Sequence, residues 1–146
     1  MTRLLVLLLL TASAHAGNST LRLDEAWLRE APPGVAVNGG YFLLCNDGKR
    51  VETLTDVSSE RFSRIEMHET FDADGTASMR KTPSVTLDPG KCVRFEPNGR
   101  HLMLFDAEPR LAEGESVELR FAFASGKEIV AIAKVHRGTP DRHHHH

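Results

Sequence analysis

Apolar and polar side chains alternate along most of this chain with a period of two residues. The clearest example is the run 117–124, VELRFAFA, in which every second side chain is large and apolar. Successive side chains of a β-strand point to opposite faces, so this alternation predicts a half-buried strand. The run 128–135 follows directly after Ser125-Gly126-Lys127, which predicts a β-hairpin. Six further runs predict strands in the same way: 35–45, 50–57, 62–69, 84–87, 92–96 and 100–105.

Turn-forming residues separate the predicted strands at short intervals. They are Asn46-Asp47-Gly48, Asp74-Gly75, Asp88-Pro89-Gly90 and Pro97-Asn98-Gly99. No segment shows an apolar stripe of 3.6-residue period longer than about two turns, which a helix would require. Because the chain also has no internal repeat and no linker, the pattern predicts a single all-β domain, either a sandwich or a small barrel.

The N-terminus has the pattern of an export signal. Arg3 precedes an apolar run over residues 4–10, and the small residues of Ala14-His15-Ala16 then precede Gly17. The apolar run is too short to span a bilayer, which takes about 20 residues. We therefore expect residues 1–16 to be a cleaved signal peptide, and we expect no membrane span after cleavage.

The 130 residues that follow the signal are enough for one hydrophobic core. We expect the folded domain over 17–136 and a flexible, His-rich tail over 137–146, since the tail carries Gly138 and Pro140 and no apolar residue. The formal charge of −2 becomes −3 without Arg3. The chain has no basic stripe, so we expect no nucleic-acid partner.

Two cysteines, Cys45 and Cys92, remain in the predicted mature chain. An exported protein folds in an oxidising compartment, so a disulfide between them is the expected state. Two free thiols are the alternative.

Two histidines and two methionines fall within 36 residues of a domain whose other large apolar residues are mainly Val, Leu, Ile and Phe: His68, Met79, His101 and Met103. A single Met in a β-protein is generally a packing residue, and a single His near a strand end is generally a solvated one. The case for a metal site therefore depends on how these four residues are arranged.

Strand alternation places two of them together. If Leu102 and Leu104 enter the core, His101 and Met103 face away from it on one side, about 7 Å apart at the backbone. In the run 62–69, the same argument directs Met67 inward and His68 outward. The sequence thus predicts a cluster of outward-facing ligands.

The donor set indicates which metal would bind. Thioether sulfur favours Cu(I) over Zn²⁺, Mg²⁺ or Ca²⁺, and imidazole binds copper in either oxidation state. No carboxylate belongs to the set, which argues against a hydrolytic zinc centre or a non-haem iron centre.

The four residues have the spacing H-x10-M-x21-H-x-M without a gap, and this spacing resembles that of the periplasmic PCu(A)C copper chaperone family. The stretches AWLREAPPGVAVNGGYFLL, MHET and NGRHLMLF are also similar to that family, and the resemblance covers residues 20–135. It implies a cupredoxin-like Greek-key β-barrel or sandwich that binds Cu(I) through His68, Met79, His101 and Met103.

The resemblance further implies delivery of copper to the binuclear copper site of cytochrome c oxidase. The implied partners are the copper-site subunit of that oxidase and SCO-type thiol copper proteins. A carrier of this kind breaks no substrate bond, so we expect a monomeric periplasmic protein that is not an enzyme.

Two features lie outside the family's ligand pattern. Cys45 and Cys92 are interpreted either as a structural disulfide or as a source of a thiolate that joins the metal. Some family members carry His-rich or Met-rich C-terminal extensions, so the tail is a candidate accessory Cu(II) site, and a purification tag is the alternative. Its candidate ligands are His136, His143, His144, His145 and His146.

Two other functions fit an exported β-protein. A blue-copper electron carrier needs a Cys, a His and a Met closely spaced in one loop, but Cys92 precedes His101 by nine residues, with a turn between them. The other alternative is an interaction or adhesion module without metal, in which the His and Met residues are incidental.

Overall fold

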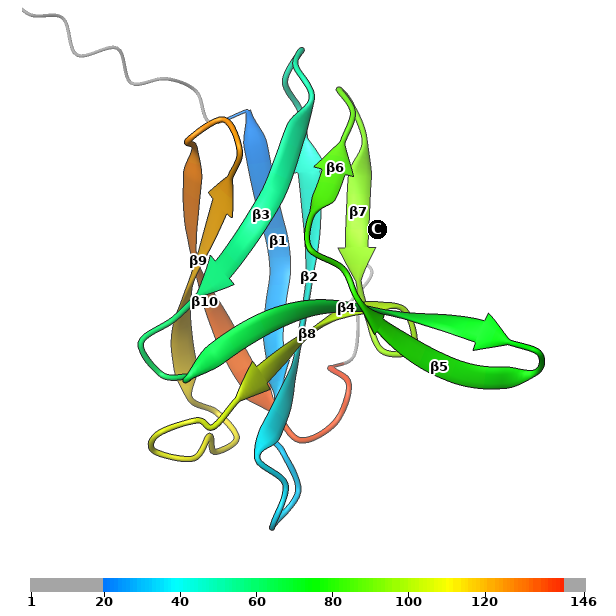
Figure 1. The fold of residues 1–146 in the computed structure, drawn as a ribbon. Coiled ribbons are helices and arrows are strands. Elements are labelled where there is room, and N and C mark those ends of the chain that lie inside the picture. The colour runs from blue at the N-terminus through cyan, green and yellow to red at the C-terminus, as the bar shows by residue number, and fades with distance from the viewer. Residues whose placement is uncertain (1–19, 141–146) are drawn as a thin grey trace, which may run out of the picture.

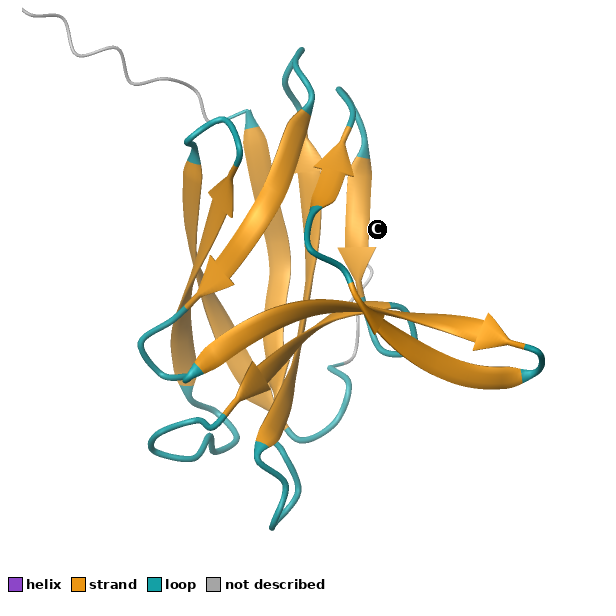
Figure 2. Ribbon diagram, in the orientation of Figure 1, coloured by secondary structure: helices purple, strands orange, loops and turns teal. Residues whose placement is uncertain are grey.

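The computed structural model describes residues 20–140, which form ten β-strands and no helix (Figure 2). The strands are β1 (Leu21–Arg29), β2 (Val37–Asn46), β3 (Glu52–Ser58), β4 (Arg64–Ala73), β5 (Thr76–Lys81), β6 (Val85–Leu87), β7 (Cys92–Phe95), β8 (Arg100–Phe105), β9 (Ser116–Phe123) and β10 (Glu128–His136). The all-β prediction is confirmed for this part of the chain, and no helix within it is long and apolar enough to cross a membrane. The predicted signal peptide at 1–16 and the histidines at 143–146 lie outside the described residues.

The ten strands form one continuous sheet in the order β5-β4-β8-β7-β2-β1-β10-β9-β3-β6. Neighbouring strands are antiparallel except for two parallel pairs, β1 with β10 and β7 with β8. The sheet curls over on itself (Figure 1). Phe42 of β2 and Phe121 of β9 therefore meet across the interior, with ring centroids 4.9 Å apart, although their strands are not neighbours in the sheet.

The core follows the alternation that the sequence predicts. Phe42 stacks on Phe95 of β7 with ring centroids 4.2 Å apart, and large aromatic side chains of this kind contribute much of the apolar area that a core buries. The inward residues of β9 are all buried: Val117, Leu119, Phe121 and Phe123.

Gly126, at the tip of the predicted hairpin between β9 and β10, has a φ of +86°, which glycine adopts without strain.

β1 is the strand in which alternation fails as a signal. Its pairing with β2 shifts between Asp24 and Trp27, and Glu25 has a φ of +53°. This is a β-bulge, which moves later residues out of phase with earlier ones. Leu21 and Leu28 are both buried although they are an odd number of positions, seven, apart, so a period of two cannot describe the whole strand.

β4 and β5 form a hairpin that extends away from the rest of the sheet (Figure 1). Asp74 and Gly75 make its turn, with φ values of +53° and +81°, the left-handed conformation that two-residue hairpin turns require. β5 lies at the edge of the sheet, and all of its residues except Ser78 are exposed. Because β5 has no core-facing side, its sequence carries no alternation, and this strand was not predicted.

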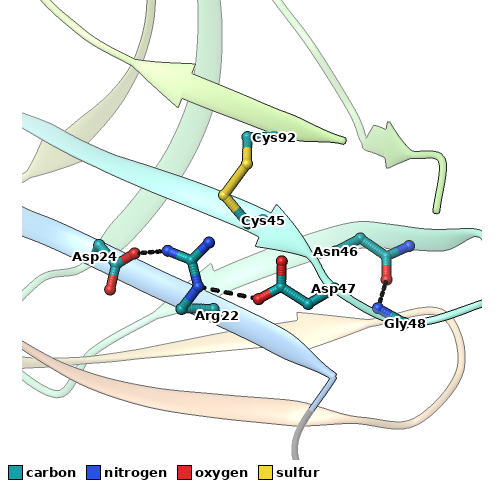
Figure 3. The surroundings of a disulfide bond; sticks show 7 residues. All are labelled: Arg22, Asp24, Cys45, Asn46, Asp47, Gly48 and Cys92. Atoms are coloured by element: carbon teal, nitrogen blue, oxygen red, sulfur yellow. Dashed lines mark hydrogen bonds and ion pairs between the residues drawn. A yellow bond between two sulfur atoms is a disulfide. The ribbon is translucent and has the colours of Figure 1, made fainter. Parts of the chain in front are cut away.

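A disulfide joins Cys45 of β2 to Cys92 of β7, as the export context predicts (Figure 3). The two residues are direct partners in the antiparallel ladder between these strands. The bond closes a loop with a sequence separation of 47 residues. It therefore removes conformational freedom mainly from the unfolded chain.

We expect the Cys45→Ala/Cys92→Ala variant to lose about 2 to 4 kcal/mol of unfolding free energy, because a loop of this length carries a large closure entropy. Urea denaturation of the oxidised wild type and the variant measures the difference, provided that the dependence on urea concentration stays similar. Equal midpoints would contradict this account.

Candidate metal centre

His68 and His101 lie directly opposite one another on β4 and β8. Their ring centroids are 6.0 Å apart, and the rings are inclined by 29°. The side chain of His68 is 16% exposed. Directly opposed side chains of an antiparallel pair are the closest neighbours on a sheet face, so the ladder brings together two imidazoles that are 33 residues apart in the chain.

Met103 lies on the same face as the two histidines. It is the ladder partner of Glu66, two residues from His68 on β4. Leu102 and Leu104 are fully buried on the opposite face, so the predicted alternation in β8 is confirmed. His68, His101 and Met103 therefore form one cluster of nitrogen and sulfur donors, which we call the His–Met cluster.

Met79 lies on the same face but at the rim of this cluster. It pairs with Thr70 across the β4–β5 hairpin and is 58% exposed. In a flat ladder, two strand spacings and four residues would separate the Cα atoms of Met79 and Met103 by about 16 Å. Both sulfurs can reach one ion only if the hairpin bends toward β8. The structure thus assembles three of the four predicted ligands, and the fourth lies on a projecting arm.

The backbone selects one tautomer of His101. Its Nδ1 lies 2.9 Å from the carbonyl oxygen of Gly99. A carbonyl oxygen only accepts hydrogen bonds, so Nδ1 carries the proton and donates it. The lone pair of the neutral ring is then on Nε2, free to bind a metal, an arrangement typical of metal-binding histidines.

A carboxylate acts in the same way on His68. The Nε2 atom of His68 lies 2.9 Å from Oε2 of Glu66, and the other carboxylate oxygen accepts from Arg64 and Lys81, each at 3.1 Å. The hydrogen bond from His68 and then that from Lys81 lower the pKa of Glu66 to about 2. An ionised carboxylate accepts only, so His68 donates through Nε2, and the lone pair of the neutral ring is then on Nδ1. Sequence reasoning missed Glu66, although its position two residues before His68 places it on the same face.

An aromatic wall closes the side of the cluster toward β2. Met103 pairs with Gly39, and a Cβ atom added to Gly39 would lie only 2.5 Å from the Tyr41 hydroxyl oxygen. Tyr41 is 8% exposed, and its burial raises the pKa of its hydroxyl. Trp27 covers it, with ring centroids 4.4 Å apart. The cluster thus has an aromatic wall on one side and the projecting hairpin on the other.

Among the described residues, His136 does not join this cluster. His136 ends β10, beside the ring of Trp27 at 6.2 Å, and β1 and β2 separate it from β8 in the sheet. Within residues 20–140, no group of three or more His, Cys, Asp or Glu side chains is placed to hold a metal ion. The His–Met cluster is of a different kind, because it includes a thioether. The other candidate tail ligands lie outside the described residues: His143, His144, His145 and His146.

The disulfide bears on the blue-copper alternative. That kind of site needs a free Cys thiolate as a ligand. Cys45 and Cys92 are bonded to each other, and no described cysteine is free. In this state the protein has no thiolate to offer a copper ion.

Comparisons with known proteins concern both the family and the fold. A model of the family described as "Putative lipoprotein LpqE-like" matches residues 21–135. An uncharacterized protein of Rickettsia prowazekii (strain Madrid E), RP573, is 31% identical over 101 residues, which cover 68% of this chain and 56% of that protein. The chain therefore spans little more than half the length of this relative.

Two solved structures have the same fold. One is described as the copper-bound PCuAC domain from PmoF2, with 23% identity and a TM-score of 0.67 over 80% of this chain and 92% of that domain. The other is the solution structure of CuI-DR1885 from Deinococcus radiodurans, with 22% identity and a TM-score of 0.66 over 84% of this chain and 83% of that protein. The predicted resemblance to PCu(A)C proteins is confirmed as a shared cupredoxin-like fold.

The Glu66 carboxyl should titrate with a midpoint near 2 in carbon-13 NMR, and His68→Ala should raise the midpoint toward the ordinary value of 4.5, because it removes the main cause of the shift. A folded-state pKa below the unfolded value means that the ionised group contributes stability above about pH 4.5, and that this contribution is lost as the pH falls through about 2. The stability difference between wild type and Glu66→Gln should therefore shrink on acidification. A wild-type midpoint near 4.5 would refute the hydrogen-bonded arrangement.

Proposed function

Because the chain belongs to the LpqE-like family and has the fold of PCuAC domains, we propose that it is an exported copper-binding protein that carries Cu(I) on the His–Met cluster. The observation that carries this proposal is the direct pairing of His68 with His101, with Met103 on the same sheet face. Two imidazoles and a thioether form a neutral, soft donor set, which suits a monovalent soft ion.

The arrangement favours a carrier over a storage protein or an enzyme. The cluster lies on the outer face of the sheet, and its third donor, Met103, is half-buried. A few neutral ligands on an open face can be replaced one at a time by the ligands of an acceptor, so the ion need not pass through free solution. Met79, exposed on the β4–β5 hairpin, is then a fourth ligand that can close on the ion and reopen during transfer.

Three observations support export as part of this proposal. The first 16 residues have the pattern of a signal peptide, the two cysteines form a disulfide, and the matching family is described as lipoproteins. The proposal has two more specific parts. One is a location in the periplasm. The other is delivery of copper to the binuclear copper site of cytochrome c oxidase, together with SCO-type thiol proteins. Both parts are supported by the resemblance of the sequence pattern to that of PCu(A)C proteins.

We expect the His101→Ala/Met103→Ala variant to bind Cu(I) at least about 100-fold more weakly than the wild type, because loss of partners that merely orient metal ligands already costs 10-fold to 100-fold. Anaerobic titration against a chromophoric Cu(I) chelator measures the affinity. His136→Ala is the matched control, since this histidine lies on the same sheet but apart from the cluster. Equal affinity of the double variant and the wild type would favour the metal-free interaction module.

A second pair of variants tests the unequal roles of the methionines. Met103→Leu should weaken Cu(I) binding by roughly tenfold or more, a difference of about 1.4 kcal/mol, and Met79→Leu should weaken it less, because Met79 lies at the rim. Leucine is close to methionine in volume, so packing changes little. An effect of Met79→Leu equal to or larger than that of Met103→Leu would show that the hairpin holds a principal ligand.

Delivery is tested separately from binding. The Cu(I)-loaded protein, mixed anaerobically with the copper-free soluble domain of the oxidase copper-site subunit, should transfer its ion. The absorption of the acceptor, measured after reoxidation, reports whether it has taken up copper. If copper stays on this protein while a thiol copper protein does load the same acceptor, the oxidase is not the recipient.

A further inference from the structure

We propose that Cys45 and Cys92 form a second soft-metal site, which opens when a dithiol reduces their disulfide and which then holds one Cu(I) between two thiolates. The proposal concerns residues outside the His–Met cluster, and it does not depend on that cluster binding copper.

The disulfide lies on the same face of the sheet as the His–Met cluster. Residues 39, 41, 43 and 45 alternate with the inward residues of β2, and Gly39 pairs with Met103. Cys45 therefore faces outward on the same strand, six residues from the position beside Met103. That separation corresponds to about 20 Å along the strand, so the disulfide and the His–Met cluster are distinct sites on one face.

The two cysteine residues differ in exposure to solvent. Cys92 is exposed, whereas Cys45 is 1% exposed. β7 pairs with β8 only through Phe95 and Arg100, so in the described part of the chain Cys92 lies at a stretch of β7 with no ladder partner on that side. An incoming thiolate can therefore approach the disulfide from the side of Cys92, because Cys45 is buried.

Cys45 also has a charged ladder partner on β1. Arg22 of β1 is the ladder partner of Cys45 on its other side. Its guanidinium is held by Asp24 and, at 3.0 Å, by Asp47 (Figure 3). The two aspartates offset the charge of the guanidinium, so the exposure of Cys92, and not a neighbouring cation, favours attack at that residue.

The exchange needs no oxidant or reductant other than the dithiol. One thiolate of the dithiol attacks the sulfur of Cys92, the Cys45–Cys92 bond breaks, and Cys45 leaves as a thiolate with the electron pair. The second thiol of the reductant, as its thiolate, then attacks the reductant's first sulfur in the mixed disulfide and releases the Cys92 thiolate. Two electrons pass from the dithiol, which becomes a disulfide, to the Cys45–Cys92 pair.

The strands stay in place when the bond opens. β2 and β7 are hydrogen-bonded partners over four residue pairs, and Phe42 and Phe95 stack beneath them at 4.2 Å. The freed side chains are then directly opposed, with Cβ atoms about 4.5 to 5.5 Å apart, and one metal ion can bridge their sulfurs. Thiolates bind Cu(I) and also Zn²⁺, but a protein zinc site generally has at least three protein ligands, and this pair supplies only two. Reduction therefore adds a copper site to a folded protein.

The test compares the number of Cu(I) ions bound by the oxidised and the reduced full chain. Protein reduced with dithiothreitol is separated from the reductant by anaerobic gel filtration and titrated with Cu(I) against a chromophoric chelator. Reduced wild type should bind one more ion than oxidised wild type and should gain ultraviolet absorption from copper–thiolate charge transfer. Cys45→Ala/Cys92→Ala should bind the same number in both conditions.

A cross-check separates this site from the His–Met cluster. The reduced His101→Ala/Met103→Ala variant should still bind one ion with the thiolate absorption, whatever the cluster does. The proposal is overturned if reduced and oxidised wild type bind equal numbers of ions. It is also overturned if reduction abolishes the near-ultraviolet circular dichroism, because the thiolates would then no longer be held by a folded sheet.

Discussion

The register between β4 and β8 is the constraint on which the candidate metal site depends. It sets His68 opposite His101 and Met103 opposite Glu66. A shift of one residue would turn every side chain of a strand to the other face. The register is fixed from the core side, where Met67, Leu102 and Leu104 are buried. The same alternation that buries these three residues exposes the ligands.

The chemistry of the cluster follows from what surrounds it. The carbonyl of Gly99 and the carboxylate of Glu66 each accept a hydrogen bond from one imidazole nitrogen, which leaves the other nitrogen of each ring free to bind a metal. The donors themselves are uncharged, so the ion is not surrounded by ligand anions. This combination of pre-oriented rings and neutral donors fits an ion that is held and then passed on.

Much of this could be predicted from the sequence, and the failures have physical causes. Alternation found the strands that bury one face, including the one that carries His101 and Met103. It could not find β5, which has no buried face, or β1, whose bulge between Asp24 and Trp27 shifts the phase. Residue spacing predicts Met79 as a ligand, but only the sheet order reveals that Met79 lies at the rim. Glu66 was missed because a search for soft ligands passes over carboxylates that orient them.

The most direct test of the central claim is copper X-ray absorption on the oxidised protein loaded with one equivalent of Cu(I). The account predicts a first shell with two nitrogen scatterers from His68 and His101 and with sulfur from Met103. A shell of sulfur alone, or one unchanged in the His68→Ala variant, would contradict the claim that the β4–β8 ladder builds the copper site.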